Sequence, residues 1–436
     1  MRRVAVLGGV RIPFCRSHTA YAELSNLDLL TASLGGLADK FALHGAHIDE
    51  VIGGAVVTHA KDWNLAREAV IGSPLSPTTP GITMMQACGT SLQGALGLAA
   101  KIATGQIDSG IALGSDTTSD APMVFQRKFA QRLVKMSRAR SLGQKLAAFK
   151  GMAPGEMAPL PPSTSEPRTG LGMGEHCELM AKEWGISRQD QDLLAFESHK
   201  KAAAAYDEGF MDDLVIPCAG VFRDNNIRED ISLEKMAELK PVFDKVGGTI
   251  TAANSTPLTD GAATVLLASE EWAEKRGIPI QAYLTLGRTS AVDYVQGEGL
   301  LMAPTVAVSE LLDQSGLALQ DFDYYEIHEA FAAQVLATLK AWESEAYCRD
   351  RLGRSAPLGA IDRTKMNVKG SSIAFGHPFA ATGARILAVL AKLLHSGGGQ
   401  RGLISLCTAG GMGVAAILEG VKASTAAGPG DKAGTA

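Results

Sequence analysis

The chain has 436 residues, which is too long for one small core and predicts two or three domains. A hydrophobic fraction of 46% and a charged fraction of 20% fit an ordinary soluble globular protein, and the net charge of −5 gives no case for nucleic-acid binding. The six cysteines show no paired spacing, which argues against disulfides and zinc and favours a reducing cytoplasm. We expect no signal peptide and no apolar run long enough to span a membrane.

Residues 1–121 alternate strand-like and helix-like segments. The pattern predicts a strand at 4–7, a helix at 27–41 with Asn26 as its N-cap, a strand at 51–57, a helix within 86–103 and a strand at 111–113. Such alternation is typical of a mostly parallel sheet with helices on both faces. The fold class is therefore α/β.

Residues 122–250 interrupt this alternation and are predicted to form an inserted loop domain on the surface. Within it, residues 125–150 carry eight Lys or Arg residues and no acid, and their apolar residues are spaced for one helix face. Such a stretch is most often a solvated helix face. Its functional interpretations are attraction of substrate phosphates, of a partner subunit or of anionic lipid.

The alternation returns at 251–279 and continues in a second α/β unit at 280–422, while 423–436 is predicted to be a flexible tail. The two units share a faint internal repeat, because Cys88 and His377 each lie six residues before a glycine of a small-residue helix. A duplicated domain would bring the two helix N-termini together about a pseudo-two-fold axis.

Two cysteines and a histidine form the candidate chemistry. Cys88 begins a predicted helix, where the helix dipole favours thiolate over thiol. His377 opens the equivalent helix and could take the proton, and a thiolate with an adjacent base is a nucleophile suited to acyl transfer. A buried strand leads to Cys407 and a small-residue loop at 409–411, whose N–H groups, with that of Cys88, could stabilise a negative oxygen. A second thiol indicates a second proton transfer, at carbon.

Four stretches together resemble the catalytic loops of the thiolase family, and a fifth resembles the family's Asn-containing loop. They are the Cys88 loop, the HEAF motif at His328–Phe331, the GHP motif at Gly376–Pro378, the CTAGGMG motif at Cys407–Gly413 and the Asn-containing loop at Thr251–Ala263. The resemblance covers about residues 1–420, and all motifs fall in the family's order. It implies two duplicated βαβ-type domains in five layers, with an inserted loop domain. It also implies coenzyme A thioester substrates, no permanently bound cofactor or metal, and a homodimer or higher oligomer.

The resemblance also implies a role for each residue of the motifs. Cys88 would form the acyl-enzyme, His377 would activate it, and Cys407 would be the acid/base at carbon. His328 would hold one oxyanion hole, and the backbone at Cys88 and Ala409 would form the other. Ala409 replaces a glycine common in the family. Most thiolases have Asn in place of His328, and the His form resembles the β-subunit of multifunctional fatty-acid oxidation complexes.

A further set of residues would bind the coenzyme A substrate by the same resemblance. These residues are Met173, Asn254, Thr256, Phe331 and Gly410. For Asn254 the alternative is a loop-holding role through side-chain to backbone bonds. For His328 the alternative is a satisfied core histidine.

The function favoured by these residues is 3-ketoacyl-CoA thiolysis in fatty-acid β-oxidation. Acyl-CoA and coenzyme A would be its small-molecule partners, with a hydratase/dehydrogenase α-subunit, or a peripheral membrane contact through 125–150, as further partners. The alternatives are the biosynthetic joining of two acetyl-CoA molecules and a non-catalytic, sterol-carrier-like binding protein. A decarboxylating condensing enzyme is disfavoured, because such enzymes have no equivalent of Cys407.

Overall fold

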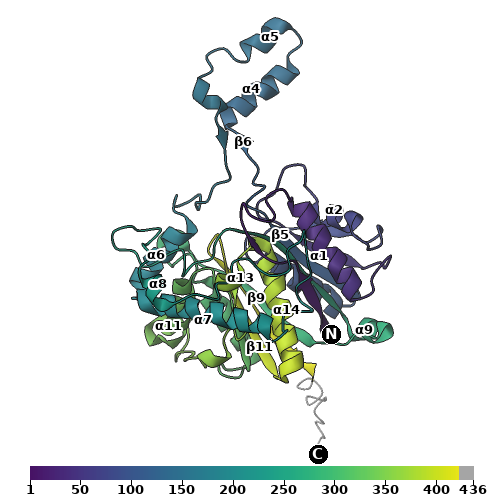
Figure 1. Ribbon diagram of the computed structural model, residues 1–436, viewed down its shortest axis with the longest axis vertical. Coiled ribbons are helices and arrows are strands. Elements are labelled where there is room, and N and C mark those ends of the chain that lie inside the picture. Colours follow the sequence, from purple (N-terminus) through teal and green to yellow (C-terminus); the bar gives the residue numbers. More distant parts are fainter. Residues whose placement is uncertain (422–436) are drawn as a thin grey trace, which may run out of the picture.

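The computed structural model describes residues 1–421 (Figure 1), and the predicted tail at 423–436 lies outside these residues. The strands are β1 (Val4–Arg11), β2 (Cys15–Arg16), β3 (Glu50–Gly54), β4 (Gly81–Thr83), β5 (Ser109–Asp116), β6 (Val124–Phe125), β7 (Pro159–Leu160), β8 (Thr259–Ser269), β9 (Ala282–Ala291), β10 (Tyr324–Ile327), β11 (Arg401–Thr408) and β12 (Met412–Gly420). The helices are α1 (Asn26–Lys40), α2 (Leu65–Gly72), α3 (Thr90–Ala103), α4 (Arg127–Arg138), α5 (Leu142–Ala147), α6 (Met173–Glu183), α7 (Arg188–Asp207), α8 (Leu233–Ala237), α9 (Glu270–Arg276), α10 (Ala303–Ser315), α11 (Ala332–Glu343), α12 (Glu345–Asp350), α13 (Ser372–Phe375) and α14 (Thr382–Gly397).

The main sheet runs in the order β10-β11-β12-β9-β1-β8-β5-β3-β4, with β2 paired to β8. Strands pair in parallel towards its two ends, at β10–β11 and at β5–β3–β4, and antiparallel through its middle. The sheet is therefore mixed, and the expected mostly parallel sheet is wrong. The short turn between β11 and β12 forces one antiparallel pair, and β8 lies antiparallel between β1 and β5. The two halves of the sheet join through a short antiparallel contact of β1 with β9.

Alternate residues of each strand point to opposite faces of the sheet, and each face is covered by helices. The fold has five layers: outer helices, one half of the sheet, the central helices, the other half of the sheet and outer helices. In the half formed by β1, β8, β5, β3 and β4, the outer face packs against α1, α2 and α9. In the half formed by β9 to β12, the outer face packs with α10 and α11. The inner faces of both halves cover α3 and α14, which form the central layer. This arrangement confirms the predicted five-layered α/β fold.

The two central helices meet at their N-terminal ends, as the internal repeat predicts. Ser91 in the first turn of α3 donates a hydrogen bond to the carbonyl oxygen of Ala380 over 2.5 Å. The same hydroxyl accepts a hydrogen bond of 2.8 Å from the backbone N–H of Ala384 on α14. Because small residues line this contact, the starts of both helices, and the loops before them, are brought side by side.

The inserted segment divides into two parts with different surroundings. Residues 124–160 stand away from the body on a long stalk that ends in α4 and α5 (Figure 1). The two strands of the stalk, β6 and β7, pair with each other. The rest of the insert, α6 and α7, packs against α11 of the C-terminal half. The domain boundaries given above stay predictions.

The apolar residues of 125–150 are expected to share one face of a helix. This stretch instead contains the end of strand β6 and two short helices, α4 and α5. Phe125 belongs to β6, and its ring packs edge-on against Phe129 of α4 with centroids 5.1 Å apart. Phe149 packs on the other side of Phe129 at 6.4 Å. This small aromatic cluster holds the tip of the protrusion together, and Phe129 is its buried centre.

Two local expectations are corrected by the structure. The N-cap of α1 is Ser25, whose hydroxyl accepts from the N–H of Asp28 in a capping box, while the side chain of Asn26 bonds to Val57 and Ser115. The expected absence of a membrane-length apolar run is also revised. The stretch 379–397 is long and apolar enough by composition, but 78% of its most apolar window is buried inside the protein, which is typical of a core helix.

Candidate active site

Cys88 lies at a sharp turn directly before α3. The preceding residue, Ala87, has a φ of +45°, a left-handed conformation that is uncommon outside glycine. The hydroxyl of Thr90 holds the turn, because it donates to the carbonyl of Ala87 and accepts from the N–H of Gln86, both over 2.8 Å. The turn places the Cys88 sulfur at the start of the central helix, where it is 8% exposed.

His377 occupies the matching place before α14. Its backbone N–H donates to Thr259 Oγ1 over 2.6 Å, and its ring Nδ1 lies 2.6 Å from Thr382 Oγ1. The other ring nitrogen, Nε2, lies 3.1 Å from Cys88 Sγ. Residues 289 positions apart in the sequence are therefore in hydrogen-bond contact, with the ring held from both sides.

The two members of this pair are both neutral at rest. Burial raises the pKa of Cys88 to about 12, although the backbone N–H groups of Ala409 and of Cys88 itself oppose the rise. Burial, and then the positive charge of Arg385, lowers the pKa of His377 to about 3. The expectation that the helix dipole favours the thiolate is not met, because desolvation outweighs it. Proton transfer from sulfur to imidazole therefore has to accompany attack on a substrate.

His328 follows strand β10, and its ring lies against that of His377. The ring centroids of His328 and His377 are 4.3 Å apart. Its Nδ1 lies 2.8 Å from Ser372 Oγ, while its Nε2 is buried and has no partner among residues 1–421. Burial lowers the pKa of His328 well below its usual value, and a protonated His377 and the charge of Arg385 act in the same direction, so the ring is neutral.

Cys407 lies near the end of β11 and is 1% exposed. Burial raises the pKa of Cys407 well above its usual value, and a thiolate at Cys88 would raise this pKa further. Ala409 lies in the turn that follows, and its backbone N–H lowers the pKa of Cys88. The N–H of Gly410 is already used, because it donates to Glu166 over 2.8 Å.

The predicted substrate-binding residues lie in different surroundings. Met173 is the first residue of α6 and is half-buried against the core of the C-terminal half. Phe331 is the N-cap of α11, and its ring packs edge-on against Phe243 at 5.9 Å. Thr256 bonds to the carbonyl oxygen of Ala330 through both its N–H and its hydroxyl. Thr256 and Phe331 thus belong to neighbouring loops beside His328.

Asn254 is buried, and its side chain is fully used within the protein. Its Oδ1 accepts from the N–H of Thr251 over 2.7 Å, and its Nδ2 donates to Asp192 and to the carbonyl of Thr249. This geometry favours the loop-holding alternative over direct substrate contact. Asn254 therefore stiffens the loop that carries Thr256.

Sequence reasoning missed the residues that hold the histidines. Ser372, Thr382 and Thr259 each bond to a histidine of the site. Glu329, next to His328, is buried and bonds to Ser198 and Asn367, both over 2.7 Å. Ser372 lies between two recognised motifs, but its distance of 44 residues from His328 left no local signal.

The same cluster brings together three side chains of types that bind metals. Single ligand atoms of Cys88, His328 and His377 lie within 4.8 Å of one another. A thiol and two imidazoles suit zinc or another soft metal. The absence of a metal from the working site stays a prediction.

The left-handed turn before Cys88 and the thiol–imidazole contact with His377 form an arrangement that suits acyl transfer, in a duplicated α/β fold. Family models for the thiolase N-terminal domain and the thiolase C-terminal domain match residues 4–271 and 280–420. The chain therefore belongs to the thiolase family, a family of acyltransferases.

Individual relatives agree over nearly the whole chain. The 3-ketoacyl-CoA thiolases of Yersinia pestis (strain Pestoides F) and Yersinia pseudotuberculosis (serotype O:1b, strain IP 31758) are each 42% identical over 423 residues, 96% of this chain and 97% of theirs. The crystal structure of the Bacillus anthracis acetyl-CoA acetyltransferase superposes with a TM-score of 0.79 and 28% identity, covering 97% of this chain and 99% of that one.

Proposed function

We propose that the protein is a 3-ketoacyl-CoA thiolase that works in fatty-acid β-oxidation. It would cleave 3-ketoacyl-CoA with coenzyme A to give acetyl-CoA and an acyl-CoA shortened by two carbons. The observation that carries the proposal is the 3.1 Å contact between Cys88 Sγ and His377 Nε2, with a second buried thiol beside it. The names of the Yersinia relatives support the choice of substrate.

The first half-reaction uses both thiols. His377 takes the proton from Cys88 as the sulfur attacks the 3-keto carbon of the substrate. The bond between carbons 2 and 3 then breaks, and its electron pair passes to carbon 2. Cys407 donates a proton to that carbon, which releases acetyl-CoA and leaves a Cys407 thiolate and an acylated Cys88.

The second half-reaction restores the enzyme. The Cys407 thiolate takes the proton of the coenzyme A thiol, whose sulfur attacks the acyl group on Cys88. The acyl group leaves as the shortened acyl-CoA, and the Cys88 sulfur recovers its proton from His377. All protons and electrons are returned, so no redox cofactor is required. Coenzyme A acts as a substrate.

Two sets of donors would stabilise the negative oxygens. The backbone N–H groups of Cys88 and Ala409 lower the pKa of Cys88 and so favour negative charge at this position, which supports their role in one oxyanion hole. The unpartnered, buried Nε2 of His328 supports its role at the thioester oxygen of the other. We still propose that the substrate contacts Thr256, Phe331 and Met173. The fully bonded side chain of Asn254 and the engaged N–H of Gly410 give those two residues supporting roles.

The second candidate is acetyl-CoA acetyltransferase activity in the biosynthetic direction, which the Bacillus anthracis structure favours by its name. The test is to measure thiolysis of 3-ketoacyl-CoA substrates of increasing chain length beside the condensation of two acetyl-CoA molecules. Thiolysis that is faster for longer chains than for acetoacetyl-CoA supports the first proposal. Activity confined to the four-carbon substrate supports the second, and no activity with any substrate supports a binding protein.

We also propose a cytoplasmic homodimer. All six cysteines are free, as in proteins of a reducing compartment. The edge strand β4 pairs with β3 on one side, and Ile82 on it and Met85 beside it are 43% and 63% exposed. Such an edge is a template for pairing with a second copy. Light scattering should give twice the chain mass of 45.6 kDa, and Ile82→Lys should reduce it to one chain.

The protrusion at 124–160 is proposed to meet an anionic surface, that of a membrane in the first place. Among residues 1–421, Arg132 is the one cation of 125–150 in an ion pair, with Glu156, so the remaining cations face solvent. Leu142 and Leu146 beside them are 73% and 67% exposed. Exposed apolar side chains beside cations favour an anionic bilayer surface.

The membrane contact is tested with vesicles of anionic and of zwitterionic lipid. Flotation should carry the protein with the anionic vesicles, and Lys135→Glu with Lys145→Glu should abolish it, while the matched pair Lys240→Glu with Lys245→Glu on the body should not. Loss of binding at high salt is also expected. If the protein does not float with either kind of vesicle but co-purifies with a dehydrogenase/hydratase subunit, the protrusion binds that subunit and not a membrane.

A further inference from the structure

A chain of buried polar groups leads from the protein interior to His328. Arg385 on α14 is 2% exposed, and its Nη2 donates to Ser372 Oγ over 2.6 Å. That oxygen lies 2.8 Å from His328 Nδ1. Glu326, two residues before His328, is fully buried, and its carboxylate lies 4.0 Å from the Arg385 guanidinium. None of these three supporting residues reaches the Cys88 sulfur in a hydrogen bond.

The hydrogen bonds of Ser372 determine which nitrogen of His328 carries the hydrogen. A guanidinium has donors and no acceptor, so Arg385 occupies a lone pair of the hydroxyl. Within residues 1–421, the other hydrogen-bond partner of Ser372 Oγ is His328 Nδ1. If Nδ1 were the donor, the hydroxyl would accept twice and its own buried hydrogen would have no acceptor among residues 1–421, so the hydroxyl donates to Nδ1. A neutral imidazole has a single hydrogen, and it is left on Nε2.

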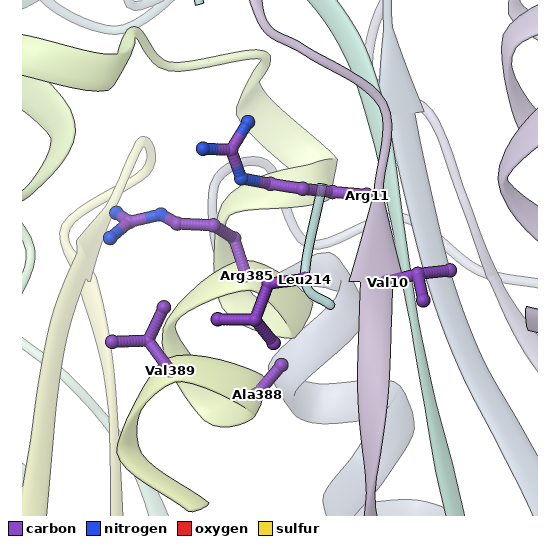
Figure 2. A pocket seen from close by; sticks show the side chains of 6 residues that line it. All are labelled: Val10, Arg11, Leu214, Arg385, Ala388 and Val389. Carbon is purple, nitrogen blue, oxygen red and sulfur yellow. The ribbon is translucent and has the colours of Figure 1, made fainter. Parts of the chain in front are cut away.

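Arg385 is fixed in place by its neighbours. It shares a small cavity of about 10 Å³ with Arg11 of β1, and Figure 2 shows both long side chains beside this cavity. Arg11 cannot compete for Glu326, because Asp224 binds both of its terminal nitrogens over 2.5 and 2.6 Å. The ring of Phe375 lies near both guanidiniums, at 5.2 Å from Arg11 and 5.7 Å from Arg385.

We propose that Arg385 and Ser372 are positioning residues that lock His328 in the tautomer with hydrogen on Nε2. In this tautomer Nε2–H is a hydrogen-bond donor without a protein partner, on a ring that lies against His377, and it is available to a substrate oxygen. With the hydrogen on Nδ1, the same nitrogen would present a lone pair and repel a negative oxygen. The kinetic part of this inference rests on the proposed thiolase reaction, and the tautomer itself does not.

The neighbouring serine provides a matched control. Ser371 also accepts from Arg385, over 3.3 and 3.4 Å, and it is fully buried. Its hydroxyl makes no hydrogen bond to His328. Ser371→Ala therefore removes a buried hydroxyl from the same guanidinium without touching the histidine, and Ser372→Ala removes the one that bonds the ring.

The kinetic test is a double-mutant cycle on thiolysis, with melting temperatures measured for every variant. His328→Ala should lower kcat by about 10²–10³-fold, as for loss of one oxyanion donor. Ser372→Ala should lower kcat about tenfold with KM unchanged, and less than about twofold more once His328 is alanine, because coupled residues are not additive. Ser371→Ala should keep kcat within about twofold of the parent. Equal losses for Ser372→Ala in both backgrounds would show a structural role and overturn the proposal.

The tautomer is measured directly on the whole enzyme labelled with ¹⁵N-histidine. The signals of His328 are identified by their loss in His328→Ala. The expected pattern is a protonated Nε2 and an unprotonated Nδ1 at neutral pH, changing in Ser372→Ala and not in Ser371→Ala. A protonated Nδ1 in the parent enzyme would overturn the inference. If no thiolysis is found, the proposed function fails while this spectrum still decides the tautomer.

Discussion

Leu92 of α3 and Gly383 of α14 meet backbone to backbone. A Cβ atom on Gly383 would lie 2.4 Å from the backbone nitrogen of Leu92, closer than real Cβ contacts allow. Cys88 lies four residues before Leu92, and His377 lies six residues before Gly383. The close approach of the two helices therefore sets how near the thiol and the imidazole come.

Gly383→Ala should separate the two helices. We expect an overpacking cost of roughly 1–3 kcal/mol in the free energy of unfolding. We also expect a fall in kcat, because the Cys88–His377 contact lengthens. Gly97→Ala on α3 is the control, since its Cβ would meet Ile52 at an ordinary 3.9 Å. Urea unfolding and thiolysis rates check both variants. A Gly383→Ala enzyme as stable and active as the Gly97→Ala enzyme would refute this explanation of the contact.

Cys88 should react as a neutral thiol. Because burial raises the pKa of Cys88 to about 12 and lowers the pKa of His377 to about 3, no ionisation of the pair falls near neutrality. The rate of Cys88 alkylation by iodoacetamide should therefore rise about tenfold per pH unit from about pH 7 to 9. Site-resolved mass spectrometry follows the reaction, with Cys88→Ser as the blank. A rate that is already constant at neutral pH would reveal a thiolate–imidazolium pair.

Cys407→Ala should separate the two kinds of chemistry. Acylation of Cys88 by acetyl-CoA needs the nucleophile, its base and an oxyanion hole, whereas bond cleavage also needs an acid at carbon. We expect thiolysis to fall by about 10²–10⁴-fold, the usual contribution of a general acid–base residue, with acetylation of Cys88 retained. Stopped assays and mass spectrometry measure the two steps. Thiolysis close to that of the parent would reduce Cys407 to a packed strand residue.

Glu326→Gln should change how stability depends on pH. Burial raises the pKa of Glu326 to about 8, only partly opposed by Arg385, so the folded state binds a proton that the unfolded state releases above its ordinary pKa. The stability given by this proton is present at low pH and is lost as pH rises towards 8. The unfolding free energy of the Gln variant relative to the parent should therefore increase between pH 5.5 and 8 by the order of 1–3 kcal/mol. No change over that range would mean that Glu326 is already ionised beside Arg385.

The sequence was sufficient for features with a local pattern. Apolar strands and small-residue helices predict the α/β class, the internal repeat predicts that the starts of the two central helices meet, and the resemblance to the thiolases implies the five layers. The strand directions were not predictable, because the antiparallel place of β8 between β1 and β5 depends on pairings of residues more than a hundred positions apart. The prediction of a thiolate at Cys88 is also wrong. The sequence indicates the helix dipole that favours the thiolate, but burial in the folded protein outweighs it.

The residues that hold the two histidines could not be predicted either, because their contacts also depend on the folded chain. Ser372 and Thr382 are ordinary hydroxyl residues in a small-residue stretch, and only the folded chain shows that each bonds a histidine. Asn254 illustrates the reverse case. Its motif suggested a substrate contact, whereas its side chain bonds only within its own loop and to Asp192.

The central claim is that Cys88 carries the acyl group. The most direct measurement is mass spectrometry of the intact enzyme and its peptides after brief mixing with acetyl-CoA, without free coenzyme A. One acetyl group should appear on Cys88, and Cys88→Ser should bind none and lose turnover while keeping its melting temperature. An acetyl group on Cys407 or on any other residue, or full activity in Cys88→Ser, would contradict the account.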